Sequence, residues 1–288
     1  MDKLLTIFTP TYNRANTLVR LYDSLLAQTS DDFIWLIVDD GSTDNTEEIV
    51  KSWIVDNIIK IQYFKQSNQG KSMAHNKGVD LTKTELFVCV DSDDYLDVNA
   101  VEDIILKWKD AKKNNTGVLA FKCTEKDRVT SIKTKINEST LKDAYDIYGL
   151  KGDTMLVFKT SIINKYSFPH FENEKFVPEA YLYDLIDQEG KLLILQKYLY
   201  VCEYLEDGYT NNMARLLKNN PKGYFAYIKQ RIQIDSKLKY KFFDYIRYVA
   251  MTKCVNYESV WNNKQDLIIK CLAYPFGILL YLKKFKKI

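Results

Sequence analysis

The sequence predicts an α/β fold in which helices cover both faces of a mostly parallel sheet, with a helical region appended at the C-terminal end. From Leu4 to about Cys123, short apolar segments rich in β-forming residues alternate with amphipathic helical segments. The strand segments are almost continuously apolar, which is typical of a sheet buried on both faces. Beyond Asn212 the pattern changes to Tyr, Phe, Lys and Leu at helical spacing.

The elements follow in order along the chain. Strands are expected at Leu4–Phe8, Ile34–Val38, Ile58–Phe64, Leu86–Val90, Val118–Cys123, Thr154–Lys159 and Lys197–Cys202. Helices are expected at Thr17–Gln28, Thr46–Trp53, Ser72–Leu81, Asn99–Lys109 and Glu179–Asp187. The stretch from Thr124 to Leu150 is polar and weakly periodic. We expect one domain over residues 1–212, with halves at about 1–123 and 124–212, and a helical region over 213–288.

Composition excludes several classes of protein. With 288 residues, 46% of them hydrophobic and 27% charged, the chain can bury a sizeable core. A net charge of +3 is too small to imply nucleic-acid binding. Five scattered cysteines favour reduced thiols in the cytoplasm. We expect no signal peptide, and the longest apolar run, Cys271 to Leu282, is too short to span a membrane.

Acidic residues end two of the expected strands. Asp39 and Asp40 follow the second strand, where open α/β sheets bind ligands, and such a carboxylate can accept the imide N–H of uracil. The alternative is a capped turn relieved by Gly41. Asp91, Ser92 and Asp93 follow the fourth strand, and two carboxylates spaced in this way suit Mg²⁺ or Mn²⁺ bridged to a diphosphate.

Other readings of the second acidic run fit less well. A calcium-binding EF-hand loop fails because Tyr95 and Leu96 occupy its fifth and sixth positions, where a ligand and a glycine are required. An aspartyl phosphatase would carry the same motif on its first strand. The acidic run therefore favours a divalent cation held with a diphosphate.

Two further loops accompany the acidic runs. Thr9 to Arg14 follows the first strand and contains Tyr12, which can stack on a base, although a strand-to-helix turn set by Pro10 explains it equally well. Asn68 to Gly78 is a glycine-containing loop that opens a helix. It matches neither dinucleotide-binding nor Walker patterns, so NAD and ATP modules are not expected. His75 alone is better explained as a packed or solvated helix residue.

Taken in order, T-P-T-Y-N-R, V-D-D-G-S-T-D, N-x-G-x-x-x-A-x-N-x-G and V-D-S-D-D resemble the family 2 glycosyltransferases, which have a GT-A fold and invert the anomeric centre of a nucleotide sugar. The specific resemblance covers about residues 4–100 and continues weakly to about 212. It implies a nucleotide half, an acceptor half, and a Mn²⁺ or Mg²⁺ ion between Asp91 and Asp93, with Asp93 the closer ligand. The implied substrate-binding residues are Thr9, Thr11, Tyr12, Arg14, Asp39, Asp40, Asn68, Gly70, Lys71, Asn76, Asp91 and Ser92.

In this family the catalytic base is commonly a Glu-Asp or Asp-Asp pair well after this motif, and Glu179 resembles the first member of the pair. Ala180 stands where the second acid is expected. Some members of the family donate a histidine to the metal late in the domain, but this chain has only His75 and His170, so a third protein ligand of that kind is not expected. The Q-x-x-R-W signature of processive polymerases is absent, which favours transfer of one sugar per encounter.

The resemblance implies an inverting, metal-dependent hexosyl- or N-acetylhexosaminyltransferase. It would use a UDP-sugar and a glycan or lipid-linked acceptor in cell-surface polysaccharide synthesis. The alternative is a catalytically silent nucleotide-sugar-binding or assembly subunit. A nucleotidyltransferase fits less well because its glycine-rich, arginine-containing opening is absent.

The C-terminal region has two interpretations. Aromatic residues at helical spacing pack helices together in most proteins. Alternatively, Leu279 to Leu282 and Phe285 lie beside lysines, as in a helix that binds anionic lipid. The second interpretation would place the protein at the cytoplasmic face of a membrane.

Overall fold

The computed structural model describes residues 3–203, 209–234, 237–255 and 266–286. Contacts group the chain into two compact units, residues 1–167 with 182–203 and residues 168–181 with 204–288. We call them the first and the second unit. The expected domain boundary at residue 212 stays a prediction.

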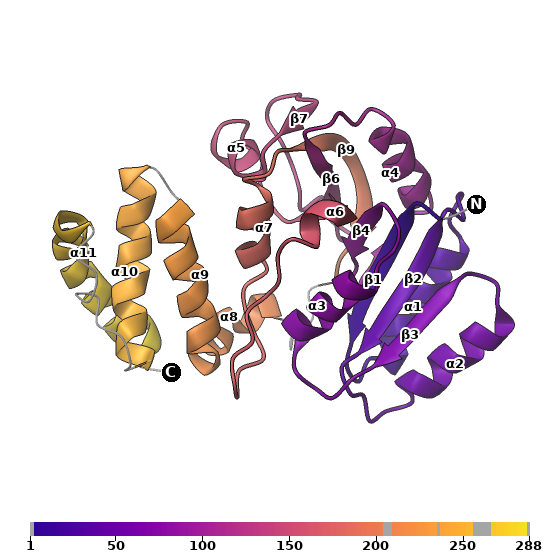
Figure 1. Cartoon of the computed structure of the whole chain (residues 1–288), viewed down its shortest axis with the longest axis horizontal. Helices are drawn as coiled ribbons and strands as arrows, with labels where there is room; N and C mark the ends of the chain where they lie inside the picture. Colours follow the sequence, from indigo (N-terminus) through magenta and orange to yellow (C-terminus); the bar gives the residue numbers. More distant parts are fainter. Residues whose placement is uncertain (1–2, 204–208, 235–236, 256–265, 287–288) are drawn as a thin grey trace. The chain divides into compact units, whose positions relative to one another are not determined.

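A parallel ladder forms one half of the sheet in the first unit (Figure 1). Its order is β3-β2-β1-β4, and every neighbouring pair in it is parallel. The strands are β1 (Leu5–Thr11), β2 (Phe33–Asp39), β3 (Ile61–Lys65) and β4 (Leu86–Cys89). Their carboxyl ends therefore lie along one edge of the sheet, which is the usual ligand-binding edge of open α/β folds.

The other half of the sheet is mixed. The order continues β8-β6-β9-β5, with β7 beside β9, and only the pair β6–β9 is parallel. These strands are β5 (Tyr95–Leu96), β6 (Asn115–Cys123), β7 (Glu138–Ser139), β8 (Thr154–Lys159) and β9 (Lys191–Val201). The α/β fold with helices on both faces is confirmed, and its parallel part is the ladder from β3 to β4.

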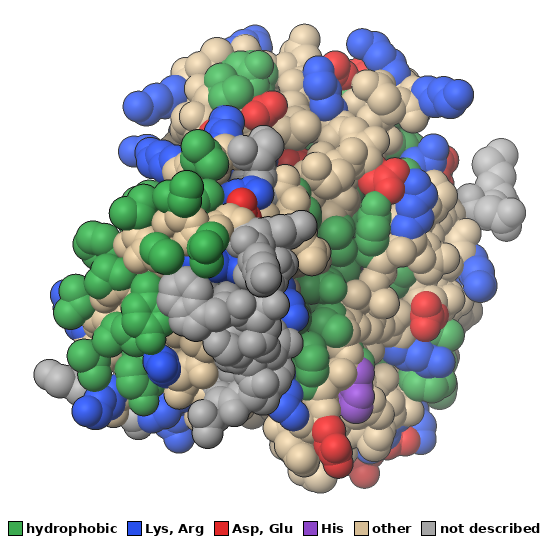
Figure 2. All heavy atoms as spheres, turned by 60° about the vertical axis from the view of Figure 1, so that its left-hand side comes forward, with side chains coloured by type: hydrophobic (Ala, Val, Ile, Leu, Met, Phe, Trp, Pro, Cys, Tyr) green, Lys and Arg blue, Asp and Glu red, His purple; other side chains and the backbone are tan. Residues whose placement is uncertain are grey.

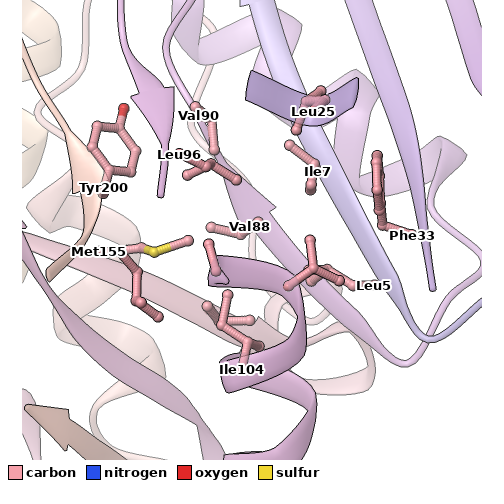
Figure 3. Packing of buried hydrophobic residues seen from close by; sticks show 14 of the residues in the cluster. Leu5, Ile7, Leu25, Phe33, Val88, Val90, Leu96, Ile104, Met155 and Tyr200 are labelled. Carbon is pink, nitrogen blue, oxygen red and sulfur yellow. The ribbon is translucent and has the colours of Figure 1, made fainter. Parts of the chain in front are cut away.

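One face of the sheet packs against three helices. They are α1 (Ala15–Leu26), α2 (Thr46–Asp56) and α4 (Ala100–Trp108). Alternate strand residues face them because side chains along a strand point to opposite faces. Figure 3 shows this core, in which residues of β1 and β4 meet Leu25 of α1 and Ile104 of α4.

The opposite face packs against α3 (Lys71–Leu81), and a glycine sets the distance. A Cβ added to Gly78 would lie 2.4 Å from the ring of Phe8. The ring of His75 meets Phe8 and Phe87 edge-on, with centroids 5.7 and 5.4 Å away. His75 is therefore a packed helix residue, as expected.

The polar stretch 124–150 contains elements that the sequence does not reveal. Besides β7 it forms α5 (Leu141–Asp146), whose N-cap Thr140 accepts a hydrogen bond from the amide of Asp143 at 3.1 Å. A short helix, α6 (Thr160–Ile163), follows β8. β7, α5 and α6 have two, six and four residues and lie outside the apolar runs that mark the strands, so the sequence does not reveal them.

The C-terminal region is helical, as expected. The helix α7 (Ala180–Ile186) links the two units in sequence. The second unit contains α8 (Tyr209–Asn219), α9 (Pro221–Ile234), α10 (Leu238–Val255) and α11 (Leu267–Leu280), followed by the π-helical turn Tyr281–Phe285. Within the described ranges, no helix combines the length and apolarity that crossing a membrane requires.

Candidate functional site

The loops that leave β1 and β2 are bound to each other. The amide of Asn13 donates to Ser42 Oγ at 2.9 Å, and Asn13 Oδ1 accepts from the amide of Thr43 at 2.8 Å. Asp44 Oδ2 accepts from the amide of Ala15, the first residue of α1, at 3.1 Å. Asn13 has a φ of +52°, a conformation that asparagine tolerates better than most residues. The two loops therefore form one structure at the ligand-binding edge.

Asp39 supports this structure from inside. It is fully buried, its Oδ1 accepts from the amide of Ser42 at 2.7 Å, and the Tyr63 hydroxyl donates to its Oδ2 at 2.5 Å. Burial, together with Asp39, raises the pKa of Tyr63, so that this hydroxyl keeps its proton as a donor. Asp39 thus stabilises the turn after β2, which was one of the two alternatives considered for this acidic run. Its role in base recognition stays a prediction.

Asp40 ties β2 to the start of α3. Its Oδ1 accepts from Gln66 Nε2 at 2.8 Å and from the amide of Gln69 at 2.9 Å, and its Oδ2 accepts from the amide of Gly70 at 2.7 Å. Gly70 has a φ of +91°, which glycine adopts without strain. These bonds fix the loop before α3, and with these three donors among the described residues the buried carboxylate keeps one further acceptor position.

Lys71 continues the connection from α3 to the end of β4. Its Nζ lies 2.7 Å from Asp91 Oδ1 and 2.9 Å from Asp91 Oδ2. The loops after β1, β2, β3 and β4 are thus joined along the edge of the parallel ladder. Of the predicted substrate-binding residues, the structure gathers Asp40, Gly70, Lys71 and Asp91 in this way.

Asp93 lies in the turn after β4, close to Asp91. Burial and the neighbouring Asp91 raise the pKa of Asp93, while Arg14 and Lys71 lower it in part. Asp91 and Asp93 offer carboxylate oxygens from one turn, and such oxygens are the ligands that a hard divalent cation prefers. Within the described residues, no cluster of three or more His, Cys, Asp or Glu side chains is able to hold a metal ion. Oxygen atoms of a diphosphate or of water would therefore have to complete the coordination shell.

Asp94 belongs to this site although it was not among the predicted residues. The Tyr200 hydroxyl donates to Asp94 Oδ2 at 2.7 Å, and the amide of Glu203 donates to Asp94 Oδ1 at 2.9 Å. Tyr200 also accepts from the amide of Asp91 at 3.0 Å. Burial and the nearby Asp91 raise the pKa of Asp94 to about 6. Asp94 and Tyr200 therefore hold the acidic turn against the end of β9.

Arg20 on α1 is a second residue that was not predicted. Its guanidinium donates to the backbone carbonyl of Asp93 and pairs with Glu203 at 2.6 Å. It also lies over the ring of Tyr95, 5.0 Å from the centroid. Asp94 could have been found as the last residue of V-D-S-D-D, but Arg20 and Tyr200 lie in ordinary helix and strand patterns.

The remaining predicted residues occupy varied positions. The Thr9 hydroxyl is buried and accepts from Trp35 Nε1 at 3.0 Å, inside the core. Thr11 is buried with no hydrogen-bond partner for its hydroxyl among the described residues. Tyr12 is exposed, and Arg14 is the half-buried N-cap of α1. Ser92 is buried, and Asn68 and Asn76 are half-buried.

Glu179, the predicted base, belongs to the second unit. Its side chain is exposed, and the residue directly precedes the first residue of α7. The amide of Tyr181 donates to the carbonyl of Pro178 at 2.9 Å, which forms the turn that carries Glu179. Its role as a base stays a prediction.

Comparison with known proteins identifies related sequences. The sequence model of glycosyl transferase family 2 matches residues 6–170, more than half of the chain. The poly(ribitol-phosphate) β-N-acetylglucosaminyltransferase TarP of Staphylococcus aureus is 25% identical over 240 residues, which cover 79% of this chain and 71% of TarP. For three other curated relatives, the match covers only 16%, 35% and 28% of their length.

Two solved structures share the fold. TarS 1-349 of S. aureus in complex with UDP-GlcNAc superposes with a TM-score of 0.64 at 18% identity, covering 96% of this chain and 80% of that one. The mannosyltransferase PcManGT of Pyrobaculum calidifontis in complex with GDP-Man and Mn²⁺ gives a TM-score of 0.60 at 13% identity, covering 99% and 89%. At these identities the likeness establishes the GT-A fold alone.

Proposed function

The chain belongs to glycosyl transferase family 2, and we propose that it transfers a single sugar from a UDP-linked donor to a glycan or lipid-linked acceptor in cell-surface polysaccharide synthesis. The connection from Asp40 through Gly70 and Lys71 to Asp91 carries the proposal, because it gathers charged groups where open α/β sheets bind nucleotides. The complex of TarS with UDP-GlcNAc supports a UDP donor and, of the two expected sugar groups, the N-acetylhexosaminyl group.

The donor would bind along the edge of the parallel ladder. Tyr12 is exposed and supplies a ring for stacking on the base, while Asp40 keeps one acceptor position for a base N–H. Lys71 and Arg14 bring positive charge beside the acidic turn, which suits a diphosphate. Asn68 and Asn76 are the proposed contacts for hydroxyl groups.

Asp91 and Asp93 are the residues that would hold Mn²⁺ or Mg²⁺. When bound, the ion would stabilise the departing diphosphate as a Lewis acid. Lys71 contributes further positive charge at the same place, since it already contacts Asp91. Asp94 and Tyr200 position the turn through hydrogen bonds to its backbone and side chains.

Glu179 is the proposed catalytic base. It would accept the proton of the acceptor hydroxyl while that oxygen bonds to the anomeric carbon and the bond from this carbon to the diphosphate breaks. A single displacement of this kind inverts the anomeric centre. A positioned base contributes typically about 10²–10⁴-fold to the rate.

The test is a panel of nucleotide sugars scored for slow hydrolysis and for transfer, with and without Mn²⁺. We expect turnover of a UDP-sugar that EDTA abolishes and that Asp93→Ala lacks. Glu179→Gln should lower kcat for transfer about 10²–10⁴-fold, whereas Glu172→Gln, an exposed residue of the same unit, should leave it unchanged. Full activity of Glu179→Gln would refute the base, and full activity in EDTA would refute the metal.

A second candidate function is a catalytically silent nucleotide-sugar-binding or assembly subunit. It is favoured by Ala180, which stands where the resemblance to the family implies a second acidic residue. Such a subunit would bind UDP with Mn²⁺ but turn over no donor in the same panel, so the two functions are separable.

We also propose that the chain acts in the cytoplasm, at the inner face of the membrane, and contacts it peripherally through its C-terminal helices. An acceptor carried on a lipid would be reached from that position. Lysines beside apolar residues near the C-terminus support the contact.

A further inference from the structure

The helix α11 has apolar residues on two faces, and only one of them packs within the second unit. On that face a Cβ added to Gly277 would lie 2.4 Å from Val249 Cβ of α10, so the two helices approach closely. Ala273 is fully buried on the same face. Lys270 is buried there as well, with its Nζ 5.5 Å from the centroid of Tyr245. This face is the packing interface with α10.

The other face of α11 is apolar and open. Ile268, Leu272, Phe276 and Leu279 are 77%, 60%, 53% and 62% exposed. At 3.6 residues per turn, these four positions fall within an arc of about 80°. Figure 2 turns the C-terminal helices forward and shows hydrophobic side chains gathered there, with Lys and Arg side chains beside them. We call these four residues the α11 stripe.

The stripe continues into a basic end. Leu282 is exposed, and so are Lys283, Lys284 and Lys286. Phe285, which the sequence placed on the lipid-binding surface, is instead buried in the core of the second unit, because it packs in the cluster that contains Phe225. The exposed apolar surface therefore runs along α11 from Ile268 to Leu279 and on to Leu282, and it does not include Phe285.

The charged residues of the segment from α11 to its basic end all have one sign. The sequence holds no Asp or Glu between residues 267 and 286. The preceding acidic residue, Asp266, accepts from the Tyr245 hydroxyl at 2.9 Å and pairs with Lys241 at 3.6 Å, so its charge is compensated. An apolar stripe with exposed lysines at its end is complementary to a surface that has an apolar interior and a negatively charged outer layer.

We infer that the α11 stripe and its lysines are a binding surface for a bilayer containing anionic phospholipid. The helix has 14 residues, about 21 Å at 1.5 Å per residue, and this is shorter than the apolar core of a bilayer, roughly 30 Å. It would therefore lie in the interface with its stripe among the acyl chains and its lysines at the head groups. A second copy of the chain on the same surface would bring lysines of like charge together. The inference rests on the membrane contact proposed above and specifies the residues that would make it.

Vesicle co-sedimentation of the intact chain, without donor or acceptor, tests the inference. The vesicles contain phosphatidylcholine alone or with phosphatidylglycerol. Ile268→Glu and Leu272→Glu each remove an apolar contact of the stripe, and Val55→Glu on α2 is the matched control, since Val55 is 82% exposed in the first unit. Circular dichroism verifies that each variant is folded.

We expect each stripe variant to bind about ten-fold or more weakly and Val55→Glu to bind as the intact chain does. Lys283→Gln combined with Lys284→Gln should lower binding to the anionic vesicles about five-fold per lysine at low salt, with Lys112→Gln and Lys113→Gln as the control pair. Failure of the intact chain to sediment, or unchanged binding of the stripe variants, would overturn the inference. Self-association that the stripe variants abolish would identify a second copy as the occupant and overturn it too. Lack of donor turnover would refute only the proposed enzyme activity.

Discussion

The buried carboxyl group of Asp94 should make the free energy of unfolding depend on pH. Its pKa is raised from 3.8 to about 6 because the carboxylate is buried near Asp91. The folded state therefore holds this proton more tightly than the unfolded state does between about pH 4 and pH 6. Over that range the unfolding free energy contributed by Asp94 falls as the pH rises, and it is constant above.

The magnitude follows from the shift. One pKa unit corresponds to about 1.4 kcal/mol, so a shift of about two units corresponds to roughly 3 kcal/mol over the whole range. About half of this lies between pH 5 and pH 7.5. Asp94→Asn cannot ionise, so its unfolding free energy lacks this part of the pH dependence. The variant also loses a hydrogen bond. Tyr200 and the amide of Glu203 donate to different oxygens of Asp94, and the side chain of asparagine has only one oxygen.

The assay is urea unfolding of both proteins at a series of pH values, followed by tryptophan fluorescence. Trp35, Trp53 and Trp108 are buried in the first unit and report on its unfolding. The intact chain should lose about 1 to 2 kcal/mol relative to the variant between pH 5 and pH 7.5. A difference between the two proteins that is constant with pH, or that changes in the opposite direction, would refute the electrostatic account of Asp94.

Two further variants test the edge of the parallel ladder and the packing behind it. Gly78→Ala places a methyl group 2.4 Å from the ring of buried Phe8, so we expect a loss of about 1–3 kcal/mol in urea unfolding, whereas a gain would show that α3 shifts freely. Asp40→Ala leaves the amides of Gln69 and Gly70 without their acceptor, at about 1–3 kcal/mol each, and should also weaken UDP binding in calorimetric titration. Unchanged UDP affinity of Asp40→Ala would show that Asp40 does not contribute to donor binding.

The sequence revealed the residues that lie next to recognisable strand ends. Asp40 and Asp91 follow buried apolar strands, and parallel strands bring such ends to one edge whatever the packing elsewhere. Thr9 is different because β1 runs on to Thr11 rather than ending at Phe8. Thr9 therefore lies within the strand, where its hydroxyl meets Trp35 in the core.

The partners of the acidic turn could not be predicted because they come from distant elements. Tyr200 is 106 residues from Asp94, and it reaches that residue only because β9 pairs with β5 and β6. Arg20 reaches the carbonyl of Asp93 from a helix whose pattern is ordinary for a packed amphipathic segment. Likewise, the spacing near the C-terminus did not show that Phe285 turns inward while Ile268 stays exposed.

Calorimetric titration of UDP into the intact chain and into Asp93→Asn, with and without Mn²⁺, tests most directly whether the acidic turn and the loops beside it bind a nucleotide diphosphate. We expect the intact chain to bind UDP much more tightly with Mn²⁺ and Asp93→Asn to lose this enhancement. Asp110→Asn, which changes an exposed residue just after α4, should keep it. Equal UDP affinity for all three proteins, whether or not Mn²⁺ is present, would contradict this expectation.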